Sequence, residues 1–138
     1  MSSEVKHYPL ISGGVKQRYA SAVVVDNLVL VSGMTVQDPA TGTCQTHGIR
    51  DQMNVCLTRT KNALEEAASS MENIVKTLVL VKDMKDFPEL RATELEFYKK
   101  HALRLVEEPP ACTAMQIVSL AKPEFLVEYE AVAVLKRT

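Results

Sequence analysis

The spacing of hydrophobic residues predicts that a β-hairpin lies near the start of the chain. Two runs rich in β-branched residues, at 20–25 and 28–32, flank Asp26-Asn27, a pair that tolerates positive φ in a tight turn. Polar and apolar positions alternate weakly in the first run, because valines follow one another at 23–25. We therefore expect these strands to be covered on both faces or to lie in an interface.

Two later segments have the spacing of amphipathic helices. From residue 49 to about residue 70, apolar side chains recur at steps of three and four residues. A second helix is predicted where Asp86 and Glu89 stand three apart as a capping box, with Pro88 in the first turn. The basic segment 99–101 suits the C-terminus of that helix. The apolar positions of the first helix are Ile49, Met53, Cys56, Leu57, Thr60, Leu64 and Ala67.

The remaining apolar runs, at 74–81, 113–118 and 125–134, predict three more strands, and the glycine- and proline-containing stretch 37–48 predicts a loop. The order ββ-α-β-α-ββ indicates an α+β fold. We expect a mixed β-sheet with two helices packed on one face. Its other face is then free to pair with another subunit, which favours an oligomer.

Composition narrows the class of protein. The 138 residues suit one domain, 1–138, and are 46% apolar and 24% charged, as in globular proteins. Because 16 basic and 17 acidic residues nearly cancel, we expect neither nucleic acid nor a membrane as a partner. Three cysteines without CxxC spacing favour a reducing compartment. The polar N-terminus and the lack of an apolar run near ~18 residues predict a cytoplasmic protein.

Generic catalytic motifs are absent from the sequence, which has no Walker loop, GxGxxG, HExxH or GxSxG. The three histidines, His7, His47 and His101, fall on a strand start, a loop and a helix end, so no metal site is predicted. Polar residues at predicted strand ends remain as candidates for a site. They are Tyr19, Ser32, Gly33, Cys112, Thr113 and the pair Glu128 and Glu130.

Glu128 and Glu130 lie two apart and therefore share one face of the last strand. Such a pair is most often a solvated face. The alternative is that one carboxyl group lies in a cleft, has a raised pKa and serves as a general base toward water.

Several segments, in this order and spacing, together resemble a known family over nearly the whole chain. They are Tyr19, Leu30-Val31-Ser32-Gly33, Asp38-Pro39-Ala40-Thr41-Gly42, Gln52, Ile74-Val75-Lys76-Thr77, Val81 to Phe87, Pro110-Ala111 and Val127-Glu128-Tyr129-Glu130-Ala131. The chain resembles the Rid family, also called YjgF, of enamine and imine deaminases. This resemblance implies a chorismate-mutase-like protomer and a homotrimer with sites in the clefts between subunits. It also implies a small-molecule substrate and no metal or organic cofactor.

The resemblance assigns roles to individual residues. In deaminating members an arginine directly after the Pro-Ala pair binds the substrate carboxylate, and a glutamate on the last strand positions water. A tyrosine, a serine-glycine backbone and an asparagine complete the pocket. Tyr19, Ser32, Gly33 and Glu128 match this pattern. Two positions depart from it, because Cys112 stands where the arginine is expected and Arg91 stands near the place of the asparagine.

The departure at Cys112 leaves the reaction open. A thiol does not replace a bidentate Arg–carboxylate pair, and losing that pair costs about 2–5 kcal/mol in a desolvated site. Arg91 either restores the charge from another wall or is a surface residue. Cys112 is either a small replacement or a nucleophile that attacks an imine or carbonyl carbon while Glu128 handles protons. Thr113, the next residue, joins the candidates for substrate binding.

The leading functional hypothesis is a hydrolase that acts on a C–N bond of an enamine, imine or amide in an inter-subunit cleft. The alternative is a diverged trimer that binds or senses a ligand without catalysis, because the expected arginine is missing. Ribonuclease activity, which has also been assigned to members of the family, ranks last, since the chain is nearly neutral and only 5% aromatic.

Overall fold

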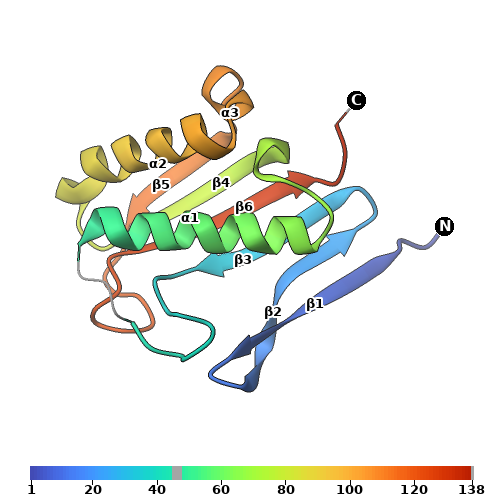
Figure 1. Ribbon diagram of the computed structural model, residues 1–138, viewed down its shortest axis with the longest axis horizontal. Coiled ribbons are helices and arrows are strands. Elements are labelled where there is room, and N and C mark those ends of the chain that lie inside the picture. The colour runs from blue at the N-terminus through green and yellow to red at the C-terminus, as the bar shows by residue number, and fades with distance from the viewer. Residues whose placement is uncertain (45–47, 138) are drawn as a thin grey trace.

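The computed structural model describes residues 1–44 and 48–137, and its six strands form one mixed sheet in the order β1-β2-β3-β6-β4-β5 (Figure 1). Strands β4 and β5 are parallel, and the other neighbours are antiparallel. The strands are β1 (Val5–Ser12), β2 (Val15–Val25), β3 (Leu28–Met34), β4 (Ile74–Val81), β5 (Ala111–Gln116) and β6 (Val127–Val134).

Helices α1 (Ile49–Glu66) and α2 (Phe87–His101) lie on the same face of this sheet, as Figure 1 shows, and a short α3 (Arg104–Glu107) follows. The predicted α+β architecture, with two helices on one face of a mixed sheet, is confirmed. The predicted hairpin is also present, because β2 and β3 pair with Val25 opposite Leu28, and Asp26 takes a positive φ of 52° in the turn. Two short 3-10 turns, Met71–Asn73 and Met84–Asp86, precede β4 and α2.

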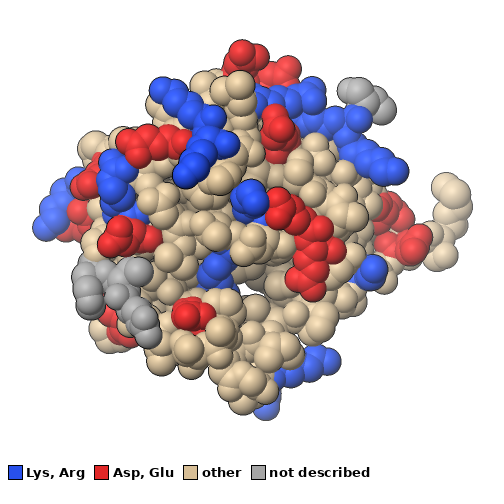
Figure 2. Space-filling view, in the orientation of Figure 1, with Lys and Arg blue, Asp and Glu red and all other residues tan. Residues whose placement is uncertain are grey.

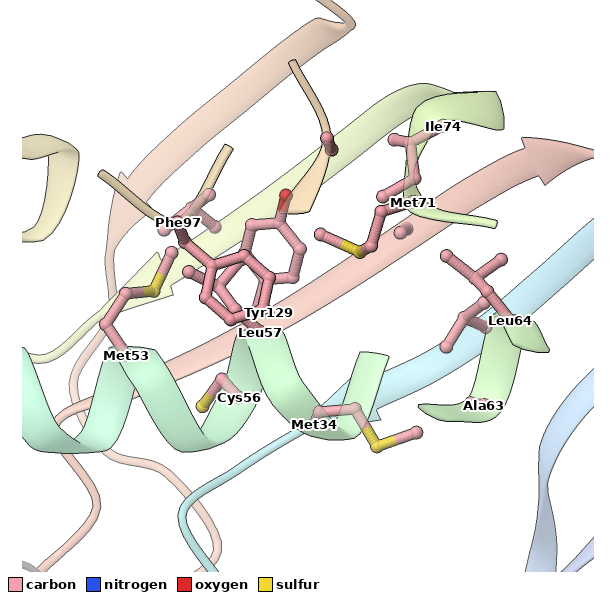
Figure 3. Close-up of a cluster of buried hydrophobic side chains, with 14 of the residues drawn as sticks. Met34, Met53, Cys56, Leu57, Ala63, Leu64, Met71, Ile74, Phe97 and Tyr129 are labelled. Carbon is pink, nitrogen blue, oxygen red and sulfur yellow. The ribbon is translucent and has the colours of Figure 1, made fainter. Parts of the chain in front are cut away.

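The hydrophobic core lies between the two helices and the sheet. Figure 3 shows Met53, Cys56 and Leu57 of α1 in this core together with Tyr129 of β6. All four side chains are completely buried. Cys56 is therefore the inert small hydrophobe that its place on the helical stripe suggests, and burial raises the pKa of its thiol to about 12.

Strand β1 was left out of the element order predicted from the sequence, although His7 was placed at a strand start. It is an edge strand with mostly exposed residues, and its pairing with β2 is irregular around Pro9. Because most residues of β1 are exposed, its sequence lacks the alternation of apolar and polar positions that indicates a strand. Pro9 is tolerated because an edge strand can lose one hydrogen bond of the sheet. Pairing with the extended chain 15–25 therefore defines β1.

The predicted capping box of α2 is wrong. Asp86 precedes the helix, but its side chain makes no capping hydrogen bond. The carboxylate of Asp83 instead accepts a hydrogen bond from the backbone N–H of Lys85 at 3.0 Å, and the turn Met84–Asp86 leads directly into the helix. The capping side chain is thus Asp83, at the start of this turn, and not Asp86.

Several predicted boundaries also move. Helix α1 ends at Glu66, β6 begins at Val127, and β5 spans Ala111–Gln116 where residues 113–118 were predicted. The shift of β5 follows from its parallel register with β4, which runs from Lys76 opposite Ala111 to Val81 opposite Gln116. Strand pairing decides where these elements begin and end, and the local sequence does not contain the information that sets this pairing.

No helix of the described chain covers the opposite face of the sheet. Leu28, Leu30 and Met115 are 45%, 43% and 42% exposed there, and Val23 and Val25, which pair with Leu30 and Leu28, are only partly buried. An apolar face of this kind suits contact with another subunit. The homotrimer stays a prediction.

Charges on the helical face are mixed, with basic and acidic side chains interspersed (Figure 2). Within residues 1–44 and 48–137, no helix is both long and apolar enough to cross a membrane.

Candidate active site

Glu128 lies against a glycine in an irregular part of the sheet. The register between β3 and β6 shifts between Val31 and Met34, which places Gly33 beside the Glu128 side chain. A Cβ atom on Gly33 would lie 2.8 Å from Cδ of Glu128, closer than real Cβ contacts allow. Position 33 therefore has to be glycine for the carboxyl group to occupy this place.

Gln52 fixes the chain just before Glu128. Its side-chain amide donates to the Glu124 carbonyl at 2.9 Å, and its oxygen accepts from the Leu126 N–H at 2.8 Å. Gln52 is 1% exposed, so these bonds also satisfy its buried amide. Helix α1 thereby sets where β6 begins and where Glu128 points.

Tyr19, Gly33 and Glu128 line one pocket of about 80 Å³. Ser32 adjoins this pocket, but its hydroxyl donates to the Ala20 carbonyl at 2.5 Å, so the side chain ties β3 to β2 next to Tyr19. The other residues lining the pocket are Leu10, Ser12, Thr35, Gln37, Arg59, Ala121 and Phe125.

Burial raises the pKa of the Glu128 carboxyl group, and the nearby charge of Glu130 raises it further. Both causes disfavour the ionised form. A carboxyl group with a raised pKa in a pocket is suited to general acid–base chemistry, whereas Glu130 is exposed.

Arg91 and Cys112 form a second cluster, between α2 and β5. One guanidinium nitrogen, Nη2, donates to Sγ of Cys112 at 3.1 Å, while Nη1 binds Oε1 of Glu94 at 2.6 Å. The guanidinium also lies over the ring of Phe87, 4.9 Å from its centroid. Three contacts thus hold Arg91 in place, and its side chain keeps 37% of its surface exposed.

Glu94 connects this cluster to a buried hydroxyl pair. It is 6% exposed, and the Tyr98 hydroxyl donates to its Oε2 at 3.4 Å. The hydroxyl groups of Tyr98 and Tyr129 lie 2.8 Å apart. Burial works against the charge of Arg91, but the hydrogen bond to Cys112 and the charge of Glu94 outweigh it, so the pKa of Arg91 is raised. The cation is therefore permanent.

A single chain does not bring Cys112 together with Glu128. Thr77 of β4 is the partner of both Cys112 and Ala131, so these three side chains share the helix-covered face. Glu128 is an odd number of residues from Ala131 and points to the other face. The two side chains are also two strands apart, or roughly 10 Å across the sheet. A Cys112 nucleophile served by Glu128 of the same chain is therefore excluded, and the predicted pairing requires a second subunit.

The remaining predicted residues divide between these places. Thr113 is exposed on the same face as Glu128, and its hydroxyl accepts a hydrogen bond from Nζ of Lys76 at 3.1 Å. His7 lies on β1 and His101 at the end of α2, while His47 lies outside the described residues. Among residues 1–44 and 48–137, no group of three or more His, Cys, Asp or Glu side chains could hold a metal ion.

Arg59 and Glu94 are site residues that the sequence reasoning missed. Glu94 follows Arg91 by three residues, a spacing at which side chains of a helix meet. The sequence could therefore have predicted an ion pair between them. Arg59 carried no such signal, because it stands among other polar residues on the outer side of the helical pattern.

Gly33→Ala tests the fit between the glycine and the carboxyl group. The new methyl group would displace the Glu128 carboxylate, and we expect activity to fall roughly tenfold to a hundredfold, because the predicted general base would no longer be in place. The melting temperature should change little, since the displaced atoms end a flexible side chain. Gly48→Ala is the matched control, because a Cβ there meets nothing within 4 Å. Full activity in Gly33→Ala would contradict this role.

Comparison with known proteins identifies the family. Residues 14–135 match the model of the family described as Endoribonuclease L-PSP. A RutC family protein of Haemophilus influenzae is 37% identical over 86% of this chain and 87% of its own. A 2-iminobutanoate/2-iminopropanoate deaminase of Bos taurus is 34% identical over 84% of this chain and 79% of its own. The crystal structure of the YjgF gene product from E. coli superposes with a TM-score of 0.79 at 28% identity, covering 92% and 94% of the two chains.

The six-stranded mixed sheet with two helices on one face is a chorismate-mutase-like α+β fold. Glu128 lies in a pocket of this fold. The chain belongs to the Endoribonuclease L-PSP family, which is the Rid or YjgF family. The sequence resemblance to this family is thereby confirmed. Deaminases among the relatives support an enamine or imine hydrolase role at the level of the family.

Proposed function

We propose that this protein hydrolyses 2-imino acids or their enamine tautomers to 2-oxo acids and ammonia. Arg91 binds the substrate carboxylate in this proposal, and Glu128 activates water. The names of the mammalian relatives, 2-iminobutanoate/2-iminopropanoate deaminases, supply the substrate class.

The observation that carries the proposal is the contact between Arg91 and Cys112. The family resemblance places a carboxylate-binding arginine at position 112, and the Arg91 guanidinium lies 3.1 Å from the sulfur of the residue that replaces it. A small side chain at 112 leaves room for an arginine from the neighbouring helix. The cation would then come from helix α2 in this protein, whereas in deaminating members it comes from the strand.

The arrangement of Arg91 suits an anion. Its contacts with Phe87, Glu94 and Cys112 fix the guanidinium before a ligand arrives, which lowers the entropy lost on binding. The exposed part of the side chain leaves donors for a carboxylate.

The proposed reaction is balanced without an external oxidant or reductant. Water adds to the imine carbon while the Glu128 carboxylate accepts one of its protons. Glu128 returns this proton to nitrogen, which gives a carbinolamine. It then takes the proton of the carbinolamine hydroxyl as the carbonyl forms and delivers it to nitrogen as the C–N bond breaks, so that ammonia leaves. The imine plus water therefore gives a 2-oxo acid plus ammonia.

Because Arg91 and Glu128 lie on opposite faces of one sheet, the proposal requires two subunits in each site. The uncovered apolar face, with Leu28, Leu30 and Met115, supports such an assembly. The open end of the Glu128 pocket on one copy would face the α2–β5 edge of another, as in the predicted homotrimer.

The test follows the decay of 2-iminobutanoate or 2-aminoacrylate generated in situ, together with the ammonia released. We expect the purified protein to accelerate decay above the rate in buffer. If the protein binds the 2-oxo acid but does not accelerate the decay of the imine, the ligand-binding alternative is favoured. Cys112→Ala separates the remaining hypotheses: a Cys112 nucleophile predicts complete loss of activity, whereas our proposal predicts that most activity is retained.

A further inference from the structure

Arg59 is a partly buried cation that forms no ion pair within the described chain. The other partly buried arginines, Arg50, Arg91 and Arg137, have a carboxylate oxygen at 2.6, 2.6 and 3.1 Å. For Arg59, no carboxylate of residues 1–44 or 48–137 comes within the 4.0 Å of an ion pair. Its Nη1 donates to the backbone carbonyl of Thr35 at 2.8 Å, which uses one of five guanidinium donors.

The surroundings of Arg59 do not offset the cost of burying its charge. Burial lowers the pKa of Arg59, and the more distant Cys56, Tyr19 and Asp38 oppose this only in part. The Asp38 carboxylate is engaged in its own turn, where it accepts from the N–H of Ala40 at 2.8 Å. A desolvated cation with unused donors is stabilised by an anionic group that enters its pocket.

Arg59 lines the same 80 Å³ pocket as Tyr19 and Glu128. The polar groups of Ser12 and Gln37 also line it, and the Gln37 amide donates to the Ser12 hydroxyl at 3.0 Å. The pocket thus contains the proposed general base and, separately, a positive site. A ligand whose reacting carbon lies at Glu128 would extend the rest of its chain toward Arg59.

We propose that Arg59 binds a second carboxylate, carried on the side chain of the substrate, so that the enzyme prefers dicarboxylic imino or enamino acids. The inference rests on the proposed function, in which Arg91 of another subunit binds the first carboxylate. Two cations then hold the two ends of the ligand, and Glu128 lies between them. A purely structural Arg59, bound only to Thr35, would be indifferent to the charge of the ligand.

Two stable 2-oxo acids of five carbons test this inference. 2-Oxoglutarate and 2-oxopentanoate differ only in a terminal carboxylate against a methyl group, and their affinities are measured by calorimetry on the full chain. We expect 2-oxoglutarate to bind at least tenfold tighter. In Arg59→Met this preference should fall to within twofold, while the affinity for 2-oxopentanoate stays the same. Equal affinities in the wild type, or a preference that survives in Arg59→Met, would overturn the inference.

Arg50→Met is the matched control, because Arg50 lies on the same helix and already pairs with Glu89 and Glu96. It should keep the full preference. If Arg59→Met does not fold, Arg59→Gln takes its place, since the amide can still donate to the Thr35 carbonyl. Imine hydrolysis without a preference for 2-oxoglutarate would refute this inference alone. A preference that depends on Arg59 without any imine hydrolysis would refute the proposed reaction alone.

Discussion

Replacing Arg91 with methionine is expected to lower kcat/KM for 2-imino acids about a hundredfold or more, because a desolvated Arg–carboxylate pair contributes about 2–5 kcal/mol. Most of the loss should appear in KM, since the carboxylate is bound in the ground state as well as in the transition state. The measurement is steady-state ammonia release from an imine generated in situ. An unchanged kcat/KM would exclude Arg91 from substrate binding.

Controls for Arg91→Met have to account for Glu94. Removing Arg91 leaves a buried carboxylate without its cation, which by itself destabilises a protein. The double variant Arg91→Met with Glu94→Gln removes that charge, so a loss of activity in a well-folded double variant reports on the substrate contact. Arg50→Met, with its exposed ion pairs, should leave kcat/KM within about twofold.

An exchange of the two residues gives the sharpest check on this interpretation. Arg91→Asn combined with Cys112→Arg restores the pattern that the resemblance implies for deaminating members. We expect the double variant to recover most of the activity that Arg91→Asn alone loses. Failure to recover would mean that Arg91 does not stand in for the strand arginine.

Glu128→Gln is expected to lower kcat by about a hundredfold to ten-thousandfold, the usual contribution of a general base, with little change in KM. The amide keeps the shape of the side chain beside Gly33 but cannot accept a proton from water. Glu130→Gln, two residues away on the same face, should retain kcat because Glu130 is exposed. A similar loss in both variants would contradict a specific role for Glu128.

The pH dependence follows from the direction of the pKa shift. The pKa of Glu128 is raised by burial and by Glu130, and the base is active when ionised. Activity should therefore fall with decreasing pH at a midpoint above the ordinary glutamate value of 4.5. Glu130→Gln should move this midpoint down, because it removes one cause of the shift.

The effect of Glu128 on the free energy of unfolding depends on pH in the opposite direction to its effect on activity, and this difference serves as an internal control. A raised pKa in the folded state contributes stability below the unfolded pKa, and that contribution is lost as the pH rises through the folded pKa. At neutral pH the ionised Glu128 therefore destabilises the folded state. Glu128→Gln should melt no lower than the wild type at pH 7, so its loss of activity would not reflect unfolding.

The sequence by itself determined the class of fold and named several residues that line the candidate pocket. Runs of β-branched residues around Asp26-Asn27 define the β2–β3 hairpin, and helical spacing defines α1. Both are local signals. The family resemblance placed Gly33 and Glu128 in one pocket, and they do lie together in it. Sequence reasoning placed the start of α2 correctly but not its capping side chain, and it left edge strand β1 out of the element order, because exposure removes the hydrophobic alternation that marks a strand.

Only the tertiary structure decided how the site residues are grouped. Sequence reasoning left open whether Arg91 is a surface residue, and the packing of α2 over β5 places its guanidinium on Cys112. The same packing pairs it with Glu94. Cys112 and Glu128 were predicted to act together, yet strand pairing puts them on opposite faces of the sheet. The physical reason is that side chains of a strand alternate at every residue, so partners across a sheet are fixed by register, which depends on contacts between distant segments.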